Sequence, residues 1–119
     1  MAIESVDPGA LPPLRTGLAF EVSAVRDGGW TTIRLDGELD LATAPVLADR
    51  FAEVFSSHPG AIVLDLADLR YCDSAGIRVL LSITARCTRD GVPIRLTNVR
   101  ENIRRVFELM SVVEALDLS

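Results

Sequence analysis

Ser74 is the residue of this chain whose type and position best fit a chemical role. It lies in the sequence Cys72-Asp73-Ser74-Ala75-Gly76, between a short apolar run and a segment with helical periodicity. Asp73 or Ser74 can cap that helix, whose first turn leaves backbone N–H groups without partners and carries partial positive charge. A phosphate on the Ser74 hydroxyl would be stabilised there by about 0.3–1 kcal/mol. The sequence therefore predicts a serine that can be phosphorylated at a helix start.

Acidic residues near Ser74 would oppose a phosphate. Asp73 precedes Ser74 directly, and the predicted fold brings Glu38 and Asp40 nearby. Two unit charges about 5 Å apart, at an effective dielectric constant of about 20, repel by about 3 kcal/mol. Phosphorylation should therefore strain the local surface and leave the core intact. A partner docked over Ser74 would respond most, because every 1.4 kcal/mol lost lowers affinity about tenfold.

Serine hydrolysis is a second chemistry that a serine between a strand and a helix can support. The pattern Gly-x-Ser-x-Gly is absent, since Cys72 and Gly76 flank Ser74 instead. The single histidine, His58, lies in the turn before the apolar strand, so we expect it near the opposite edge of the sheet. The sequence therefore predicts a protein that is not an enzyme.

Five carboxylates could form an acid–base pair or a magnesium site: Glu38, Asp40, Asp65, Asp68 and Asp73. Turns and helix caps favour aspartate for structural reasons, and no glycine-rich phosphate loop accompanies these residues. We therefore predict neither a metal nor a cofactor. For Asp40 alone we favour a functional role.

Composition and charge narrow the class of protein. The chain has 119 residues, enough for one domain, and a formal net charge of −5, which argues against nucleic acid or an anionic membrane as partner. Cys72 and Cys87 lack the spacing of a zinc site or disulfide framework, so two reduced thiols are expected. Without a signal peptide or a run of about 20 apolar residues, the expected location is the cytoplasm.

The elements that position Ser74 follow from hydrophobic periodicity. Residues 1–17 hold several prolines and glycines with little periodicity, which predicts a mobile N-terminal tail before a domain over 18–119. Alternation on both sides of Asp27-Gly28-Gly29 predicts a β-hairpin. Thr43 is predicted to cap a helix with Pro45 in its first turn. The apolar run 61–66 predicts an inner strand covered on both faces and followed by a polar bend.

The second half of the chain continues this alternation. A helix over 74–89 precedes a strand near 92–97, and Asn98 with Glu101 resembles a capping box that opens a last helix. Residues 112–116 fit either a short strand or a frayed tail. The predicted order is β-β-α-β-α-β-α, which indicates an α/β fold with a mixed sheet of four to five strands. Gly76, in a first helical turn, suggests close approach by a neighbouring loop or by a docked partner.

Three short motifs resemble one family. Asp73-Ser74-Ala75-Gly76 after a strand, Gly37-Glu38-Leu39-Asp40 after an earlier strand, and Arg105-Val106-Phe107-Glu108-Leu109 in a late helix look like the anti-sigma factor antagonists of the STAS domain family. Their order and spacing cover about residues 18–116. The resemblance implies a single STAS-like domain that acts as a switch and not as a catalyst.

The resemblance also implies roles for individual residues. Ser74 matches the position that an anti-sigma factor with serine kinase activity phosphorylates, and a PP2C-type phosphatase would reverse this modification. The remaining partner-binding residues would be Glu38, Asp40, Asp73, Ala75, Gly76 and Arg78. In this scheme the unphosphorylated protein binds the anti-sigma factor and frees the sigma factor, and phosphorylation abolishes binding.

The match has departures and leaves an alternative. Many relatives carry a second hydroxyl where this chain has Ala75, place a glycine near Met110-Ser111, and end in a further helix that we do not expect here. The alternative function is a STAS accessory subunit of a transport complex, without a phosphorylation cycle. A weak homodimer is a further association that the sequence leaves open.

Overall fold

The computed structural model describes residues 10–15 and 20–116, which form one mixed sheet and three helices. The elements follow in the order β1 (Ala10–Arg15), β2 (Phe20–Asp27), β3 (Trp30–Leu39), α1 (Ala44–Ser56), β4 (Ala61–Cys72), α2 (Ser74–Arg89), β5 (Ile94–Thr97) and α3 (Glu101–Leu109). From β2 onward this is the predicted order β-β-α-β-α-β-α. The prediction of an α/β fold with a mixed sheet is confirmed.

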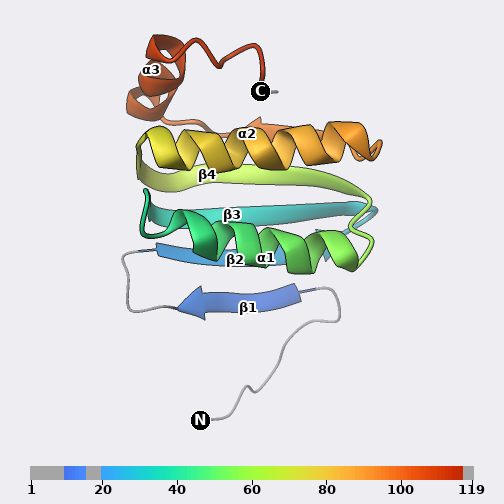
Figure 1. Ribbon diagram of the computed structural model, residues 1–119. Helices are drawn as coiled ribbons and strands as arrows, with labels where there is room; N and C mark the ends of the chain where they lie inside the picture. The colour runs from blue at the N-terminus through green and yellow to red at the C-terminus, as the bar shows by residue number, and fades with distance from the viewer. Residues whose placement is uncertain (1–9, 16–19, 117–119) are drawn as a thin grey trace.

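The strands lie side by side in the order β1-β2-β3-β4-β5. β1 and β3 run antiparallel to β2, whereas β3, β4 and β5 run parallel to one another. Helix α1 connects β3 to β4 and α2 connects β4 to β5, and both helices lie over the same face of the sheet (Figure 1). The carboxyl ends of β3 and β4 therefore meet at one edge of the sheet, where α2 begins.

The core lies between the sheet and these two helices. Alternate strand residues point toward the helices because successive side chains of a strand face opposite sides. They meet the apolar stripes of α1 and α2. The buried residues include Val22, Ile33, Leu35, Ile62, Leu64 and Leu66 from the strands and Leu47, Phe51, Ile77, Leu80 and Ile83 from the helices.

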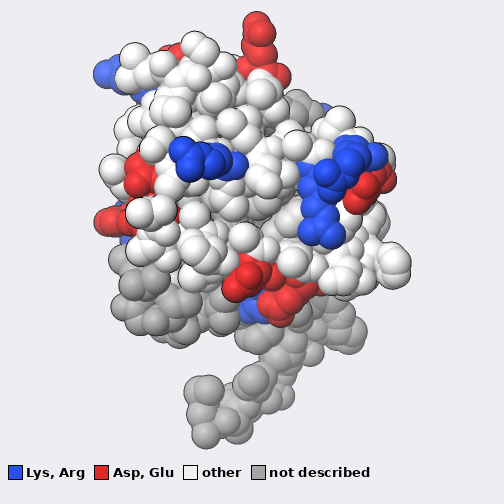
Figure 2. All heavy atoms as spheres, viewed as in Figure 1, with Lys and Arg blue, Asp and Glu red and all other residues white. Residues whose placement is uncertain are grey.

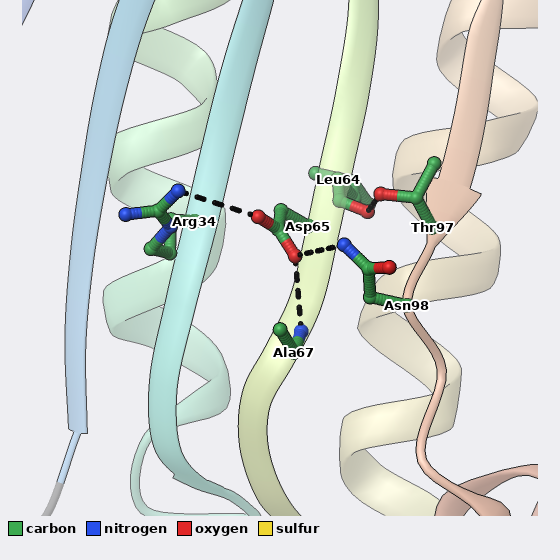
Figure 3. A network of polar contacts seen from close by, with 6 residues as sticks. All are labelled: Arg34, Leu64, Asp65, Ala67, Thr97 and Asn98. Carbon is green, nitrogen blue, oxygen red and sulfur yellow. Dashed lines mark hydrogen bonds and ion pairs between the residues drawn. The ribbon is translucent and has the colours of Figure 1, made fainter.

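The opposite face of the sheet is not covered by α1 or α2. Along the first part of β4, buried residues alternate with half-buried ones such as Val63 and Asp65. The prediction of a strand covered on both faces is therefore wrong, because an unbroken apolar run does not distinguish a covered face from a partly open one. Figure 3 shows the open face, on which the Asp65 carboxylate lies between the Arg34 and Asn98 side chains.

Asp65 is the centre of a polar network on this open face. One carboxylate oxygen accepts hydrogen bonds from Asn98 Nδ2 and from the Ala67 N–H, each at 3.0 Å, and the other lies 3.5 Å from a guanidinium nitrogen of Arg34 (Figure 3). Burial alone would raise the pKa of Asp65, but these hydrogen bonds and the charge of Arg34 outweigh it and lower the pKa. The network joins β3, β4 and the turn after β5.

Strand β1 corrects the prediction for the N-terminal region. The tail predicted over residues 1–17 is wrong for Ala10–Arg15, which pair antiparallel with β2 at the edge of the sheet. The register shifts between Leu11 and Leu14, where Pro12 and Pro13 lie. Proline is tolerated on an edge strand, so the absence of a regular pattern did not exclude a strand. The other residues of the predicted tail lie outside the described residues.

Strand β4 also differs from its prediction. It continues from Ala61 to Cys72, through the positions where a polar bend was expected after Leu66. The register with β3 is irregular between the pairs Arg34–Asp65 and Asp36–Asp68. A local irregularity of this kind bends a strand without ending it. Residues 113–115 form turns and Leu116 is buried, so residues 112–116 are neither the short strand nor the frayed tail considered for them.

The predicted capping box before α3 is wrong as well. Asn98 has a φ of 58° and donates to Asp65, and the residue that precedes α3 is Arg100, which makes no side-chain cap. The Asn98 amide hydrogen-bonds across the sheet edge instead of to its own helix. A tertiary contact has replaced the local one, which no local pattern could indicate.

Candidate functional site

The junction between β4 and α2 presents the Ser74 hydroxyl at the surface. Asp73 precedes α2 in extended conformation, and its Oδ1 accepts a 3.0 Å hydrogen bond from the Gly76 N–H. Ser74 is the first residue of α2 and is exposed. Of the two capping residues considered from the sequence, Asp73 caps the helix. The Ser74 hydroxyl makes no hydrogen bond with any other described residue, so it is open to modification.

Position 76 requires a glycine because the end of β3 packs closely against the first turn of α2. It is buried, and a Cβ built at this position would lie 2.7 Å from the Leu39 carbonyl oxygen and 2.8 Å from Cys72 Sγ. Side chains do not tolerate such distances from backbone, so β3 can approach α2 this closely only at a glycine. The neighbouring segment considered from the sequence is therefore what approaches Gly76.

The end of β3 lies beside the junction. Glu38 is paired with Tyr71 and Leu39 with Cys72 in the parallel register, and the Asp73 N–H donates to the Leu39 carbonyl at 3.1 Å. Glu38 and Tyr71 are exposed. The structure thus brings Glu38 to the strand ends from which α2 starts.

Asp40 has a structural role in the turn after β3. Its Oδ1 accepts hydrogen bonds from the N–H groups of Ala42 and Thr43, each at 3.0 Å, and its carbonyl accepts from the Ala44 N–H at 2.8 Å. Thr43 was predicted to cap α1, but its side chain makes no cap and donates instead to the Glu38 carbonyl at 2.8 Å. Asp40 therefore organises the start of α1, and its half-buried position limits how much of it a partner could contact.

A hollow of about 330 Å³ lies between α1 and α2 next to Ser74, and we call it the groove. It is lined by Leu41, Ala44, Pro45, Ala48, Ala75, Arg78, Val79 and Ser82. Of these residues, the sequence motifs had indicated only Ala75 and Arg78. The others were missed because exposed alanines carry no functional pattern. The available signal was Leu41, an isolated leucine in a polar turn, whose exposed fraction is 78%.

Charged side chains are exposed on both helices that form the groove. Figure 2 shows basic side chains over α2 and acidic side chains over α1. Exposed arginines of α2 are Arg78, Arg86 and Arg89, and the exposed acids of α1 are Asp49 and Glu53. Arg78 forms no ion pair with any residue in the described ranges. Of these charged residues, only Arg78 lines the groove, and Glu53 is paired with Arg50 at 3.3 Å.

The remaining polar residues do not assemble a catalytic site around Ser74. His58 is exposed in the turn before β4, and the length of β4 separates it from Ser74, as predicted. Burial, with a smaller effect of the Asp73 charge, raises the pKa of Cys72 to about 12, so this thiol stays protonated. Among residues 10–15 and 20–116 no group of three or more metal-binding side chains occurs, and no helix could span a membrane.

Comparisons with known proteins place these features in context. A family model described as "Mlab, STAS domain" matches residues 22–117. The anti-sigma-B factor antagonist of Bacillus subtilis is 27% identical over 88 residues, which cover 73% of this chain and 79% of the relative.

Two solved structures show the same fold at 20% identity. An anti-sigma factor antagonist from Mycobacterium paratuberculosis superposes with a TM-score of 0.71 over 83% of this chain and 84% of that one. A sulfate transporter family protein from Wolinella succinogenes superposes with a TM-score of 0.66 over 77% and 75% of the two chains. The fold is thus shared by proteins with different named roles.

Proposed function

Because this chain belongs to the STAS domain family, we propose that it is an anti-sigma factor antagonist controlled by phosphorylation of Ser74. The unphosphorylated form binds an anti-sigma factor that is also a serine kinase, and so releases a sigma factor. Phosphorylation abolishes this binding, and a PP2C-type phosphatase restores it. The single observation that supports this role best is the exposed Ser74 hydroxyl, free of hydrogen bonds to other described residues, at the first position of α2.

The surface around Ser74 supports a switch based on charge. Glu38 is exposed beside the junction and Asp73 is half-buried within it. A phosphoserine adds a charge of about −1.5 to −2 at neutral pH. Placed next to these carboxylates, that charge changes a docking surface without disturbing the core, since the apolar residues of α2 point the other way. The partner therefore loses affinity while the fold is retained.

The protein acts as a substrate and a regulator in this proposal, not as an enzyme, and it works in the cytoplasm. Glu38, Asp40, Asp73, Ser74, Ala75 and Arg78 are its proposed partner-binding residues. Gly76 is buried and contributes by allowing β3 and α2 to approach. A weak homodimer is compatible with this proposal.

The direct test is phosphorylation by the anti-sigma kinase of the same organism. Incubation with that kinase and ATP, followed by mass spectrometry of the peptides, is expected to place phosphate on Ser74. Ser74→Ala should keep the fold and the complex, whereas Ser74→Asp should weaken the complex about tenfold, a difference of about 1.4 kcal/mol. Phosphate on another residue with Ser74 unmodified, or equal affinities of the two variants, would contradict the proposal.

A second candidate is a permanent accessory subunit of a transporter, which the fold of the Wolinella protein supports. Such a subunit has no need of a phosphorylation cycle. Affinity purification from the native cells distinguishes the two functions. A transporter subunit that co-purifies in equal amount before and after phosphatase treatment would favour this second role.

A further inference from the structure

The hairpin end of the open sheet face carries exposed apolar side chains. Val25 on β2 is 51% exposed and Trp30 on β3 is 42% exposed, and half-buried Ala61 and Val63 continue this surface on β4. Each of them neighbours a buried residue that points toward the helices, so all four lie on the open face. Contiguous apolar surface of this kind marks sites of contact with other proteins.

Two rows of paired residues cross the open face from β2 to β5. The first row consists of Ser23, Arg34, Asp65 and Thr97, and the second row, closer to the hairpin, of Val25, Thr32, Val63 and Arg95. The Arg34 side chain is 58% exposed, and beyond its 3.5 Å contact with Asp65 it makes no hydrogen bond or ion pair with a described residue (Figure 3). Arg95 is exposed and forms no ion pair within the described ranges. Both basic groups are therefore available to another chain.

The first row is complementary to a second copy of itself. A two-fold axis between β3 and β4, parallel to the strands, places β3 of one copy opposite β4 of the other copy, and β2 opposite β5. Arg34 of each copy then faces Asp65 of the other copy. A two-fold axis perpendicular to the strands would instead place each strand opposite itself, and Arg34 would face no acidic partner. The charges therefore select the parallel axis.

The apolar residues fit the same arrangement. Trp30 of each copy faces Ala61 of the other copy, so a large side chain lies opposite a small one. In the second row, Val25 faces the apolar stem of Arg95, which can cover it while the guanidinium stays in water. Burial of this surface supplies the attraction between the copies.

We propose that two copies of this chain form a weak dimer through the open faces of their sheets, related by this two-fold axis. Four strands with three paired positions each span about 20 by 20 Å, so the dimer buries on the order of 1,000 Å² in total, the size of weak complexes. The inference goes beyond the proposed function. The hairpin lies at the other end of β3 from the Ser74 junction, so the dimer leaves Ser74 accessible.

The first test measures association. In sedimentation velocity of the full chain between about 1 and about 500 µM, the mass should increase from one copy to two, because a weak dimer forms only at high concentration. Trp30 is the single tryptophan of the chain and lies in the proposed contact. Its fluorescence emission should shift to shorter wavelength over the same range, because the indole leaves water. One copy at every concentration, or a dimer with unchanged Trp30 emission, would overturn the proposal.

The second test places like charges in the contact. Val25→Arg puts an arginine opposite Arg95 of the other copy and should weaken the dimer about tenfold or more. Leu109→Arg is the matched control, because Leu109 is an exposed apolar residue of α3, outside the open face. This control should dimerise like the wild type. Equal affinities of the two variants would show that the dimer contact is not at the open face.

The third test restores the contact. Val25→Arg combined with Arg95→Glu places opposite charges across the axis and should recover most of the lost affinity. Within one copy, positions 25 and 95 lie on β2 and β5, which two strands separate by about 14 Å, so recovery reports contact between copies. A double variant that dimerises as weakly as Val25→Arg would refute the two-fold arrangement.

Discussion

Two strand-to-helix junctions use their polar side chains in opposite ways. Before α2, the Asp73 side chain accepts a hydrogen bond from its own helix, and the Ser74 hydroxyl makes no hydrogen bond to another described residue. Before α3, no side chain caps the helix, and the residues there bond to β4. Asn98 Nδ2 donates to Asp65 at 3.0 Å, Arg100 Nε to the Ala67 carbonyl at 2.8 Å, and Asn102 Nδ2 to the Arg70 carbonyl at 3.1 Å.

The difference separates two roles. The β5–α3 junction holds the last helix to the sheet, since its donors are used within the molecule. The β4–α2 junction is stabilised by backbone proximity at Gly76 and by one capping carboxylate, which leaves its outer atoms available. Changes at the β5–α3 junction should therefore affect stability alone. Changes at the outer atoms of the β4–α2 junction should affect binding alone.

The largest loss of stability is expected at Gly76, where the end of β3 packs against the start of α2. Gly76→Val would place side-chain atoms against the Leu39 carbonyl and Cys72 Sγ, and overpacking of a buried site costs about 1–3 kcal/mol, with a branched residue near the upper value. Urea denaturation measures the free energy of unfolding. Ala85→Val, at an exposed position of the same helix, is the control. Equal stabilities of the two variants would show that β3 and α2 can separate without cost.

A smaller loss of about 2 kcal/mol is expected for Asp65→Ala. The substitution removes the acceptor of Asn98 and of the Ala67 N–H and the ion pair with Arg34. The rate of Ser74 phosphorylation should remain unchanged, because this network lies on the open face of the sheet. A slower rate of phosphorylation would contradict the claim that the two junctions have separate roles in stability and binding.

The same carboxylate predicts a dependence on pH. The pKa of Asp65 is lower in the folded protein than the value of about 4 that it has when unfolded, so its stabilising effect is complete above pH 4. The effect is lost as the pH falls through the folded pKa. Below pH 4 the free energy of unfolding should therefore fall less steeply for Asp65→Asn than for the wild type. Asp27→Asn, on the exposed hairpin, is the control.

A loss of about 1 kcal/mol is expected for Asp73→Ala, because the Gly76 N–H loses its cap. Asp73→Asn keeps an acceptor oxygen and should retain most of the stability. Thermal unfolding of the two variants measures the difference. A destabilised Asn variant together with a stable Ala variant would mean that the charge of Asp73, and not its hydrogen bond, matters for folding.

The smallest effect is expected for Ser74→Ala. The hydroxyl is exposed and bonds to no other described residue, so the free energy of unfolding should change by less than about 0.5 kcal/mol. Phosphate incorporation should nevertheless be lost completely. A loss of stability comparable to that of Asp73→Ala would assign Ser74 a structural role.

Local patterns were sufficient for much of the fold. The spacing of Ile77, Leu80 and Thr84 indicated α2, and the turn Asp27-Gly28-Gly29 indicated the hairpin, because these signals depend on neighbouring residues alone. The position of Glu38 beside the junction followed from the topology. Elements that depend on distant partners were predicted less well. Strand β1 was missed because Pro12 and Pro13 interrupt the pattern of a strand, although an edge strand tolerates proline.

The site shows the same limit. The cap at Asp73 and the exposure of Ser74 could be predicted from the sequence, since both depend on the first turn of α2. The roles of Asp40 and Asn98 were not, because each residue could bond either locally or across a turn, and only the packed structure selects between them. The groove arises from alanines on two helices that are far apart in the sequence.

Strand β5 is short, and this has a consequence for how the molecule behaves at high concentration. It pairs with only the first part of β4, from Ile62 to Asp65, and the rest of that strand could otherwise accept a strand from another chain. The side chains of Arg100 and Asn102 occupy the carbonyls of Ala67 and Arg70 on this stretch. The longest strand of the sheet is thereby protected from intermolecular strand addition, the first step of amyloid-like aggregation.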